Sequence, residues 1–298
     1  MTADHLSRAG SDLGRIAILG AGQIGTMLGL ALRDGGCADV WMLDKQPEVA
    51  EMSLDLGAAS GLMSSTREAL DCDTMILAMP VPQIVKTIKE LGPHMRRGSF
   101  VVDTGSAKVA IIESMRSHIP PGVHAIGGHP LVGTERPGPQ GARPQLMKGA
   151  SFVFTEVRED QTAFDRACSL ATLVGARMYE VDAETHDACL ARTSHIAHIA
   201  AFALASLNDQ VSLPGWRGLS SPGYERAVRL ANSDAEMVAG FVGANAQYVK
   251  GVLDEVISKL AEASRLLSDA PEDLTALLAT WQRSAVRDIP LYETEAAV

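Results

Sequence analysis

His129 lies in the segment Ile126–Gly138, IGGHPLVGTERPG, where a His-Pro pair stands between two glycine-rich patches. An imidazole accepts and releases protons near neutral pH, so His129 is a candidate general base, the alternative being a loop histidine bonded to the backbone. Two other polar residues suit the same chemistry. The hydroxyl of Ser106, in DTGSAK, can orient a reacting group, and the guanidinium of Arg229, in AVRLANSD, can bind a carboxylate through paired hydrogen bonds.

Two further histidines, His195 and His198, are three residues apart in an expected helix, so they share one of its faces. They could line a substrate pocket, pack inside the helical region or bind zinc. A zinc site would need a third ligand, and the chain has neither an H-E-x-x-H motif nor a cysteine pair with metal-binding spacing. We therefore expect no metal and favour a substrate-facing position for both histidines.

The elements that would position these residues begin with a glycine-rich turn, GAGQIG, at residues 20–25. An apolar run precedes it and a helical pattern follows, which is the arrangement of a dinucleotide-binding βαβ unit. Asp44 ends the next apolar run, 19 residues after Gly25, where a carboxylate binds the ribose hydroxyls and repels a 2′-phosphate. The pattern predicts NAD as the cofactor. The expected cofactor-binding residues are Gly20, Gly22, Gln23, Ile24, Gly25, Asp44, Pro80 and Asp103.

Further apolar runs predict that a mostly parallel sheet continues beyond this unit. They occupy residues 74–80, 99–108, 123–130, 151–155 and 177–181. Because ligands of open α/β sheets bind outside the carboxyl ends of the strands, Pro80, Ser106 and His129 should face one crevice. The segment 134–149, rich in Pro, Gly and Arg, is expected to form a long loop that covers this crevice.

After Asp182, helical periodicity replaces the strand-like runs. Asp182 can cap a helix that begins at Ala183, a long helix is expected at 235–267, and a last helix should run from Pro271 to about Asp288. An apolar pattern on more than one side of the long helix indicates contact with a second copy of the chain. We predict a flexible tail at 1–13, a Rossmann-type doubly wound α/β domain at 14–182 and an all-helical dimerisation domain at 183–298.

Composition narrows the class of function. The chain has 298 residues, a formal net charge of −10 and a pI near 5.3, which argue against nucleic acid as its main partner. Its N-terminus has no apolar segment of the secretory kind, and no uninterrupted apolar run approaches the roughly 18 residues of a membrane span. Four widely spaced cysteines fit reduced thiols. We expect a cytoplasmic protein that binds a small molecule and no membrane.

Taken together, GAGQIG, DTGSAK, GGHPLVGTE, THDACLARTSHIAH and RLANSD, in this order and spacing, resemble the prephenate and arogenate dehydrogenases. The resemblance implies oxidative decarboxylation of a cyclohexadiene: a hydride leaves ring C4 for NAD, the C1 carboxylate departs as CO₂ and the ring becomes aromatic. It implies that His129 accepts a hydrogen bond or the proton of the C4 substituent, that Ser106 orients this group, and that Arg229 binds a substrate carboxylate. It also places His195, His198, Thr134 and Gly128 at the substrate.

The chain departs from the family pattern around the expected substrate. Gly128 stands where serine is usual before the His-Pro pair, Glu225-Arg226 replaces an Arg-Asp pair, and Ala235 and Val238 replace Pro and Trp. One branch of the family acts on 4-amino-4-deoxyprephenate in antibiotic pathways, and an added acid such as Glu225 could favour an amine at C4. Prephenate, arogenate and this amine all stay open as substrates.

Two other classes of protein share the glycine turn. A β-hydroxyacid dehydrogenase or imine reductase would carry a lysine at the start of the interdomain helix, where this chain has only histidines. A non-catalytic NAD-sensing regulator would need the glycine turn but not Ser106, His129 and Arg229 together. The combination of these three residues favours an enzyme.

Overall fold

The computed structural model describes residues 12–134, 136–207 and 219–286. The first part of the predicted tail, Glu135, residues 208–218 and the residues after 286 lie outside these ranges. The folded chain begins earlier than predicted, because Leu13 is fully buried and its carbonyl accepts a hydrogen bond from Thr74 Oγ1 at 2.7 Å. Residues 12 and 13 therefore belong to the folded part rather than to a tail.

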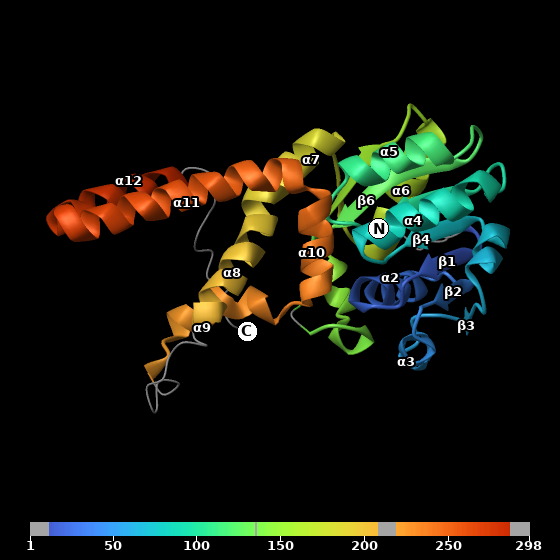
Figure 1. The fold of residues 1–298 in the computed structure, drawn as a ribbon. Coiled ribbons are helices and arrows are strands. Elements are labelled where there is room, and N and C mark those ends of the chain that lie inside the picture. The colour runs from blue at the N-terminus through green and yellow to red at the C-terminus, as the bar shows by residue number, and fades with distance from the viewer. Residues whose placement is uncertain (1–11, 135, 208–218, 287–298) are drawn as a thin grey trace. The chain divides into compact units, whose positions relative to one another are not determined.

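An eight-stranded sheet forms the centre of the nucleotide-binding half (Figure 1). Its spatial order is β3-β2-β1-β4-β5-β6-β7-β8, and all neighbouring strands are parallel except β6 and β7, which are antiparallel. The order reverses between β1 and β4, which confirms the predicted Rossmann-type sheet. The strands are β1 (Ile16–Leu19), β2 (Val40–Leu43), β3 (Gly61–Leu62), β4 (Thr74–Leu77), β5 (Phe100–Asp103), β6 (His124–Pro130), β7 (Ser151–Glu156) and β8 (Arg177–Glu180).

Helices cover both faces of this sheet (Figure 1). On one face, α2 (Gln23–Asp34) and α6 (Gln161–Val174) pack on apolar side chains of the strands. On the other face, α4 (Val81–Leu91) and α5 (Val109–His118) do the same. The sheet is thus buried on both sides, which is why its strands are apolar runs without alternation. The shorter elements are α3 (Pro47–Asp55) and the 3-10 helices η1 (Thr66–Asp71), η2 (Gly92–His94), η3 (Pro139–Gly141) and η4 (Pro144–Met147).

The helical half begins as predicted and then departs in one place. Asp182 Oδ1 accepts a hydrogen bond from Thr185 N at 2.8 Å, which caps the first helix. The long helix expected at 235–267 is interrupted at Asn245, whose side chain bonds to other helices. The elements are α7 (Ala183–Leu190), a π-helical turn (Ala191–His195), α8 (Ile196–Ser206), α9 (Pro222–Val228), η8 (Arg229–Asn232), α10 (Ala235–Ala244), α11 (Ala246–Asp269), η9 (Pro271–Asp273) and α12 (Leu274–Val286).

The chain forms two compact units, Met1–Val249 and Lys250–Val298. Helices α7 to α10 therefore group with the sheet, although the helical pattern of the sequence begins at residue 183. The second unit holds nearly all of α11 together with α12. Within it, the ammonium nitrogen of Lys259 lies 5.3 Å from the centre of the Trp281 ring.

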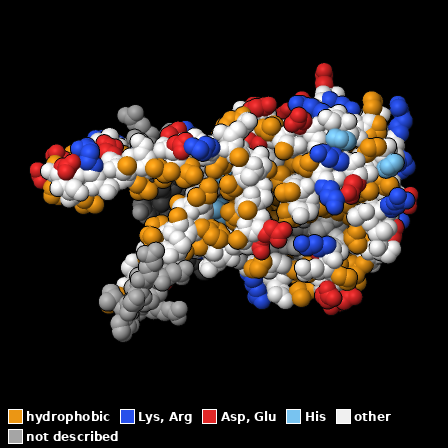
Figure 2. Space-filling view, in the orientation of Figure 1, with side chains coloured by type: hydrophobic (Ala, Val, Ile, Leu, Met, Phe, Trp, Pro, Cys, Tyr) orange, Lys and Arg blue, Asp and Glu red, His pale blue; other side chains and the backbone are white. Residues whose placement is uncertain are grey.

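One helical stretch of the described residues, Ala183–Ser206, is long and apolar enough to cross a membrane by length and composition alone. A search for uninterrupted apolar runs misses it because polar residues interrupt it. Three of these, His186, Asp187 and His195, are buried and bond to other elements, as in a helix that packs on protein. Only 17% of the apolar window is buried, and Figure 2 shows hydrophobic side chains on the surface where α8 lies. This helix thus leaves apolar surface uncovered in the single chain.

Candidate active site

Strand β6 fixes the position of His129. Successive residues of a strand point to opposite faces, so His129 shares its face with Ala125, which packs on the α4–α5 side. Antiparallel pairing with β7 places His129 opposite Val153. The imidazole is therefore held in a hydrogen-bonded strand, nearly buried at 9% exposure, rather than in a free loop.

A cavity of about 560 Å³ opens beside His129. Its volume falls in the range of small-molecule sites, which is about 300–1,000 Å³. Three segments far apart in the sequence form its wall: the residues after the His-Pro pair, the loop predicted to cover the crevice, and the helix that begins at residue 183. The lining residues are His129, Pro130, Leu131, Val132, Gly133, Leu146, Ala150, Leu190, Thr193 and Ser194.

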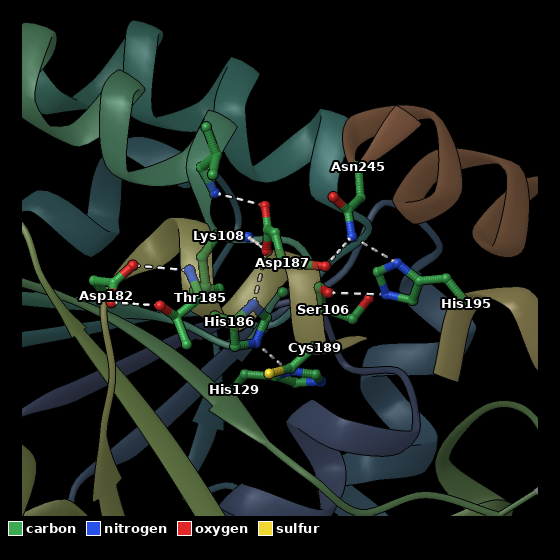
Figure 3. Close-up of polar contacts among 12 residues, drawn as sticks. Ser106, Lys108, His129, Asp182, Thr185, His186, Asp187, Cys189, His195 and Asn245 are labelled. Carbon is green, nitrogen blue, oxygen red and sulfur yellow. Dashed lines mark hydrogen bonds and ion pairs between the residues drawn. The ribbon is translucent and has the colours of Figure 1, made fainter. Parts of the chain in front are cut away.

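A chain of hydrogen bonds runs from His129 into the protein (Figure 3). Nδ1 of His129 lies 2.9 Å from Nε2 of His186, and Nδ1 of His186 lies 2.7 Å from Oδ1 of Asp187. An ionised carboxylate only accepts hydrogen bonds, so His186 donates through Nδ1. A His186 ring that carries its single proton on Nδ1 accepts at Nε2 from the Nδ1–H of His129. This arrangement leaves the lone pair of His129 on Nε2.

Asp187 is held in place by other parts of the chain. Its carboxylate accepts hydrogen bonds from the backbone N–H groups of Lys108 at 2.6 Å and Val109 at 2.9 Å, at the start of α5. Its backbone carbonyl accepts from Asn245 Nδ2 at 2.8 Å. The carboxylate, which accepts three hydrogen bonds in all, is fully buried and has a fixed orientation.

Burial keeps His129 in its neutral form. Removal of the imidazole from water lowers the pKa of His129 well below 6.5, and the nearby His186, Lys108 and His195 lower it further. Near neutral pH the ring is therefore unprotonated at one nitrogen. A neutral imidazole with its lone pair on Nε2 can accept a proton.

The structure uses His195 differently from the predicted contact with substrate. His195 is fully buried, and its Nδ1 accepts from Asn245 Nδ2 at 3.0 Å, so its Nε2 donates to the carbonyl of Ser106 at 3.1 Å. Burial lowers the pKa of His195 to about 4. Both ring nitrogens are engaged within the protein, and the residue positions the Ser106 segment (Figure 3). The contact seen for Ser106 is made by its backbone carbonyl.

Asp103, which was predicted to contact the cofactor, instead bonds to three residues inside the protein. Its buried carboxylate pairs with the ammonium group of Lys108 and accepts from Gly105 N at 2.7 Å and Gly128 N at 3.1 Å. Lys108 Nζ donates in turn to the carbonyl of Gly128 at 2.7 Å. Because its carboxylate is occupied in this way, Asp103 joins the end of β5 to the residue before His129.

Gly128 has no room for a side chain. A Cβ atom there would lie 2.5 Å from the carbonyl oxygen of Asp103 and 2.8 Å from Cγ2 of Val102. Both neighbours belong to the sheet interior, on the face opposite to His129. Only the backbone of residue 128 could therefore make the predicted contact with substrate. The close packing around this position explains why it is a glycine.

The glycine turn has the geometry that a bound pyrophosphate needs. Gly20 has φ +102°, and a Cβ on Gly25 would lie 1.9 Å from the carbonyl of Gly20, so both positions require glycine. A Cβ on Gly22 would meet nothing within 4 Å, which leaves open space beside the start of α2. Oδ2 of Asp44 accepts from Ala21 N at 2.8 Å, so the carboxylate stands next to this turn.

Gln23 and Thr134 bond to each other rather than standing free for ligands. Nε2 of Gln23 donates to the carbonyl and hydroxyl oxygens of Thr134 at 3.0 and 2.8 Å, and to the carbonyl of Arg136 at 2.5 Å. The backbone N–H of Thr134 donates to Oε1 of Gln23 at 2.9 Å. A Cβ on Gly141 would lie 1.8 Å from the carbonyl of Arg136, so glycine lets the loop close around this contact.

Four predicted residues stand apart from the cavity wall. Arg229 is exposed on η8, and His198 is half-buried, with its Nδ1 donating to the carbonyl of Ser194 at 3.2 Å. Pro80 is exposed at the start of α4, beyond the end of β4. Ile24 opens α2 next to Gln23 and is half-buried. Their roles toward ligands stay predictions.

The sequence reasoning missed His186, Asp187, Lys108 and Asn245 as parts of this site. His186 and Asp187 stand in the motif THDACLARTSHIAH, and Lys108 ends DTGSAK, so the motifs themselves carried the signal. Among the described residues no group of three or more His, Cys, Asp and Glu side chains has an arrangement that would hold a metal ion.

Both halves of the chain match known families. Residues 28–180 match the model described as prephenate dehydrogenase, nucleotide-binding domain, and residues 182–282 match prephenate dehydrogenase, dimerization domain. A cyclohexadienyl dehydrogenase of Zymomonas mobilis is 26% identical over 265 residues, which are 87% of this chain and 90% of that protein.

Two further proteins are similar. A 4-amino-4-deoxyprephenate dehydrogenase of Streptomyces pristinaespiralis is 29% identical over 208 residues, 66% of this chain and 64% of that protein. The crystal structure of a prephenate dehydrogenase of Aquifex aeolicus, in complex with hydroxyphenyl propionate and NAD⁺, has a TM-score of 0.81 and 24% identity, covering 92% of this chain and 97% of that one. The fold of this structure is therefore shared along nearly the whole chain.

Proposed function

The chain belongs to the prephenate dehydrogenase family, and from this premise we propose that it catalyses the NAD-dependent oxidative decarboxylation of a prephenate-type cyclohexadiene. The substrate is prephenate or arogenate, and the product is 4-hydroxyphenylpyruvate or tyrosine. The observation that carries the proposal is the nearly buried imidazole of His129, which lines a cavity of small-molecule size and is hydrogen-bonded to His186, which is bonded in turn to Asp187. Membership of this family argues against the β-hydroxyacid dehydrogenase and imine reductase alternatives.

His129 acts on the C4 hydroxyl of the substrate. As the C4–H electrons leave, Nε2 of His129 takes the hydroxyl proton, so that a carbonyl forms at C4 instead of an oxygen-stabilised cation. Cleavage of the bond from C1 to its carboxylate releases CO₂, and the electron pair makes the ring aromatic as a phenolate. Return of the proton from His129 gives the phenol, so that no proton is consumed overall.

The residues of the glycine turn fit NAD. Gly20, Gly22 and Gly25 shape the turn for the pyrophosphate, and the carboxylate of Asp44 would receive the ribose hydroxyls. The same negative charge would repel the 2′-phosphate of NADP. Bound NAD supplies the acceptor for the hydride that leaves C4.

A second substrate is favoured by one observation, the likeness to a 4-amino-4-deoxyprephenate dehydrogenase. An amine at C4 would also lose an N–H proton as the hydride leaves, and His129 could accept it in the same way. Glu225, which the sequence suggested as a partner for such an amine, is exposed on α9 and is not part of the cavity wall. The product would be 4-aminophenylpyruvate, a precursor in antibiotic biosynthesis.

We further propose a cytoplasmic homodimer. The helical half matches a dimerization domain, and α8 leaves apolar surface uncovered in the single chain. Arg229 lies on η8, which packs on α8, the helix with the uncovered apolar surface. In the dimer Arg229 would bind a carboxylate of the substrate. Size-exclusion chromatography with light scattering measures the assembly directly.

The test of the function is NADH formation by purified protein with NAD⁺ and, in parallel, prephenate, arogenate and 4-amino-4-deoxyprephenate. CO₂ released in equal amount to NADH distinguishes oxidative decarboxylation from simple oxidation. His129→Asn should lower kcat by about 10²- to 10⁴-fold and keep NAD⁺ binding. Bound NAD⁺ without turnover of any of the three substrates would instead support a non-catalytic regulator.

A further inference from the structure

We propose that His186 and Asp187 are positioning residues that hold His129 in the tautomer with the proton on Nδ1, which leaves Nε2 free to accept the proton of the substrate. This inference rests on the proposed function, in which His129 is the base. A histidine side chain with one proton exists as two tautomers, and only one of them can act as a base at Nε2. The second histidine decides which one is present.

The geometry sets the protons one after another. The carboxylate of Asp187 fixes the proton of His186 on Nδ1, at 2.7 Å, because a carboxylate cannot donate. Nε2 of His186 is then an acceptor, and the contact of 2.9 Å requires that Nδ1 of His129 be the donor. With the opposite tautomer of His129, two lone pairs would face each other between two nearly buried rings, and the hydrogen bond between them would be lost.

Asp187 is well placed to impose this order because hydrogen bonds hold both its carboxylate and its backbone. Two backbone N–H groups at the start of α5 donate to its carboxylate, and Asn245 holds its backbone carbonyl. These contacts fix the direction from which the carboxylate can accept from His186. The start of α5 and the residue between α10 and α11 thus both bond to Asp187 of α7, the first at its carboxylate and the second at its backbone carbonyl (Figure 3).

The competing explanation is a purely structural role, in which His186 only fills space between β6 and α7. Two variants separate the two roles. His186→Leu keeps a side chain of moderate size but removes the acceptor, whereas His186→Gln can present its amide oxygen to Nδ1–H of His129. A packing role predicts similar defects in both variants, and a positioning role predicts rescue by glutamine.

The first measurement is the ¹⁵N chemical shifts of His129 in the full-length protein labelled at its histidines, with His129→Asn used to assign the signals. Wild-type His129 should be neutral and protonated on Nδ1 at neutral pH. His186→Leu should shift the ring toward the Nε2–H tautomer, and His186→Gln should keep the wild-type pattern. A wild-type ring protonated on Nε2 would overturn the proposal without any variant, so the test survives a variant that fails to fold.

The second measurement is steady-state kinetics of the same proteins. His186→Leu should lower kcat by about 10²-fold, the scale of a general base that is held in the wrong form, with the KM for NAD⁺ unchanged. His186→Gln should recover most of kcat. Equal losses in both variants with an unchanged His129 tautomer would leave only the structural role. If the wild type turns over no cyclohexadiene, the proposed function fails, and the tautomer measurement still decides the positioning role.

Discussion

Gln23 and Thr134 are joined at both ends of one side-chain amide: Nε2 of Gln23 donates to the carbonyl of Thr134 at 3.0 Å, and Oε1 accepts from its N–H at 2.9 Å. The two residues are 111 positions apart. Gln23 begins the helix that faces the dinucleotide, and Thr134 lies just after the wall of the cavity. The glycine turn and the segment that follows the cavity wall are therefore joined by hydrogen bonds.

Substitution of Gln23 by leucine should loosen the loop. The variant loses the four hydrogen bonds to Thr134 and Arg136, and we expect faster amide hydrogen exchange in residues 133–141 and an increase of about tenfold in the KM for substrate. Hydrogen-exchange mass spectrometry measures the first effect. Gln46→Leu, at an exposed glutamine without a side-chain cap bond, is the matched control. Unchanged exchange in Gln23→Leu would disprove the coupling.

Gly128→Ser should cost stability rather than change the substrate. The added Cβ would meet the Asp103 carbonyl at 2.5 Å inside the sheet, so we expect a loss of about 1–3 kcal/mol in the free energy of unfolding. Gly251→Ala, where a Cβ meets nothing within 4 Å, should be neutral or stabilising. Urea denaturation provides both values. A stable Gly128→Ser enzyme with an altered ratio of prephenate to amine turnover would contradict this expectation.

Asp44→Asn should weaken the choice of NAD over NADP. The amide oxygen can still accept from Ala21 N, but the charge that repels a 2′-phosphate is gone. We expect the ratio of kcat/KM for the two cofactors to change by at least about tenfold, which corresponds to about 1.4 kcal/mol. Asp55→Asn, at an exposed aspartate of α3, should leave the ratio as in the wild type. A constant ratio in Asp44→Asn would rule out the ribose contact.

The pH dependence of kcat/KM should follow the lowered pKa of His129. The base works in its neutral form, and burial holds this pKa well below 6.5. Activity should therefore stay constant as pH falls through 6.5 and decline only in more acidic solution, as one proton binds. A pH profile in a buffer of constant ionic strength tests this. A decline centred at 6.5 or above would show that the base is more exposed than His129 is here.

The stability of the protein should depend on His195 in mildly acidic solution. Its pKa is lowered to about 4, whereas the unfolded chain titrates near 6.5, so between these values the unfolded state binds more protons. The contribution of neutral His195 is complete above pH 6.5 and is lost as pH falls toward 4. His195→Gln should make the free energy of unfolding less dependent on pH in this window. Equal slopes for variant and wild type would contradict the assignment.

The sequence predicted the parts of the site that depend on local rules. Gly20 and Gly25 are required by one turn, and His129 stands near the carboxyl end of an apolar strand. The glycine turn and the histidine could therefore each be found from neighbouring residues. The fold was confirmed for the same reason, since each βα unit carries its own pattern. The break at Asn245 escaped prediction because an asparagine in a helical pattern shows no local signal of a bond to Asp187.

The partners of these residues could not be predicted, because they come from distant parts of the chain. His186 lies 57 residues from His129, and neither spacing nor composition indicates that their rings meet. Lys108 looks like a surface residue in sequence and is fully buried, since its charge is matched by Asp103. For His195, helical spacing correctly indicated a shared face with His198, as both rings contact Phe241, but not that the imidazole is enclosed.

The π-helical turn Ala191–His195 places one extra residue between the start and the end of the helical stretch that carries the site. Each residue of an α-helix turns the direction of the side chains by about 100°, so removal of one residue from this turn would rotate His195 away from Ser106, while Asp187 on α7 kept its contacts with the start of α5. The irregular turn thus sets the angle (the phase) between the side chains of Asp187 and His195. A regular helix could not satisfy the contacts of both residues together. Homologous helices that make the same contacts should differ in length here only by changes that keep this phase. The number of residues between Asp187 and His195 is therefore fixed by the contacts that these two residues make.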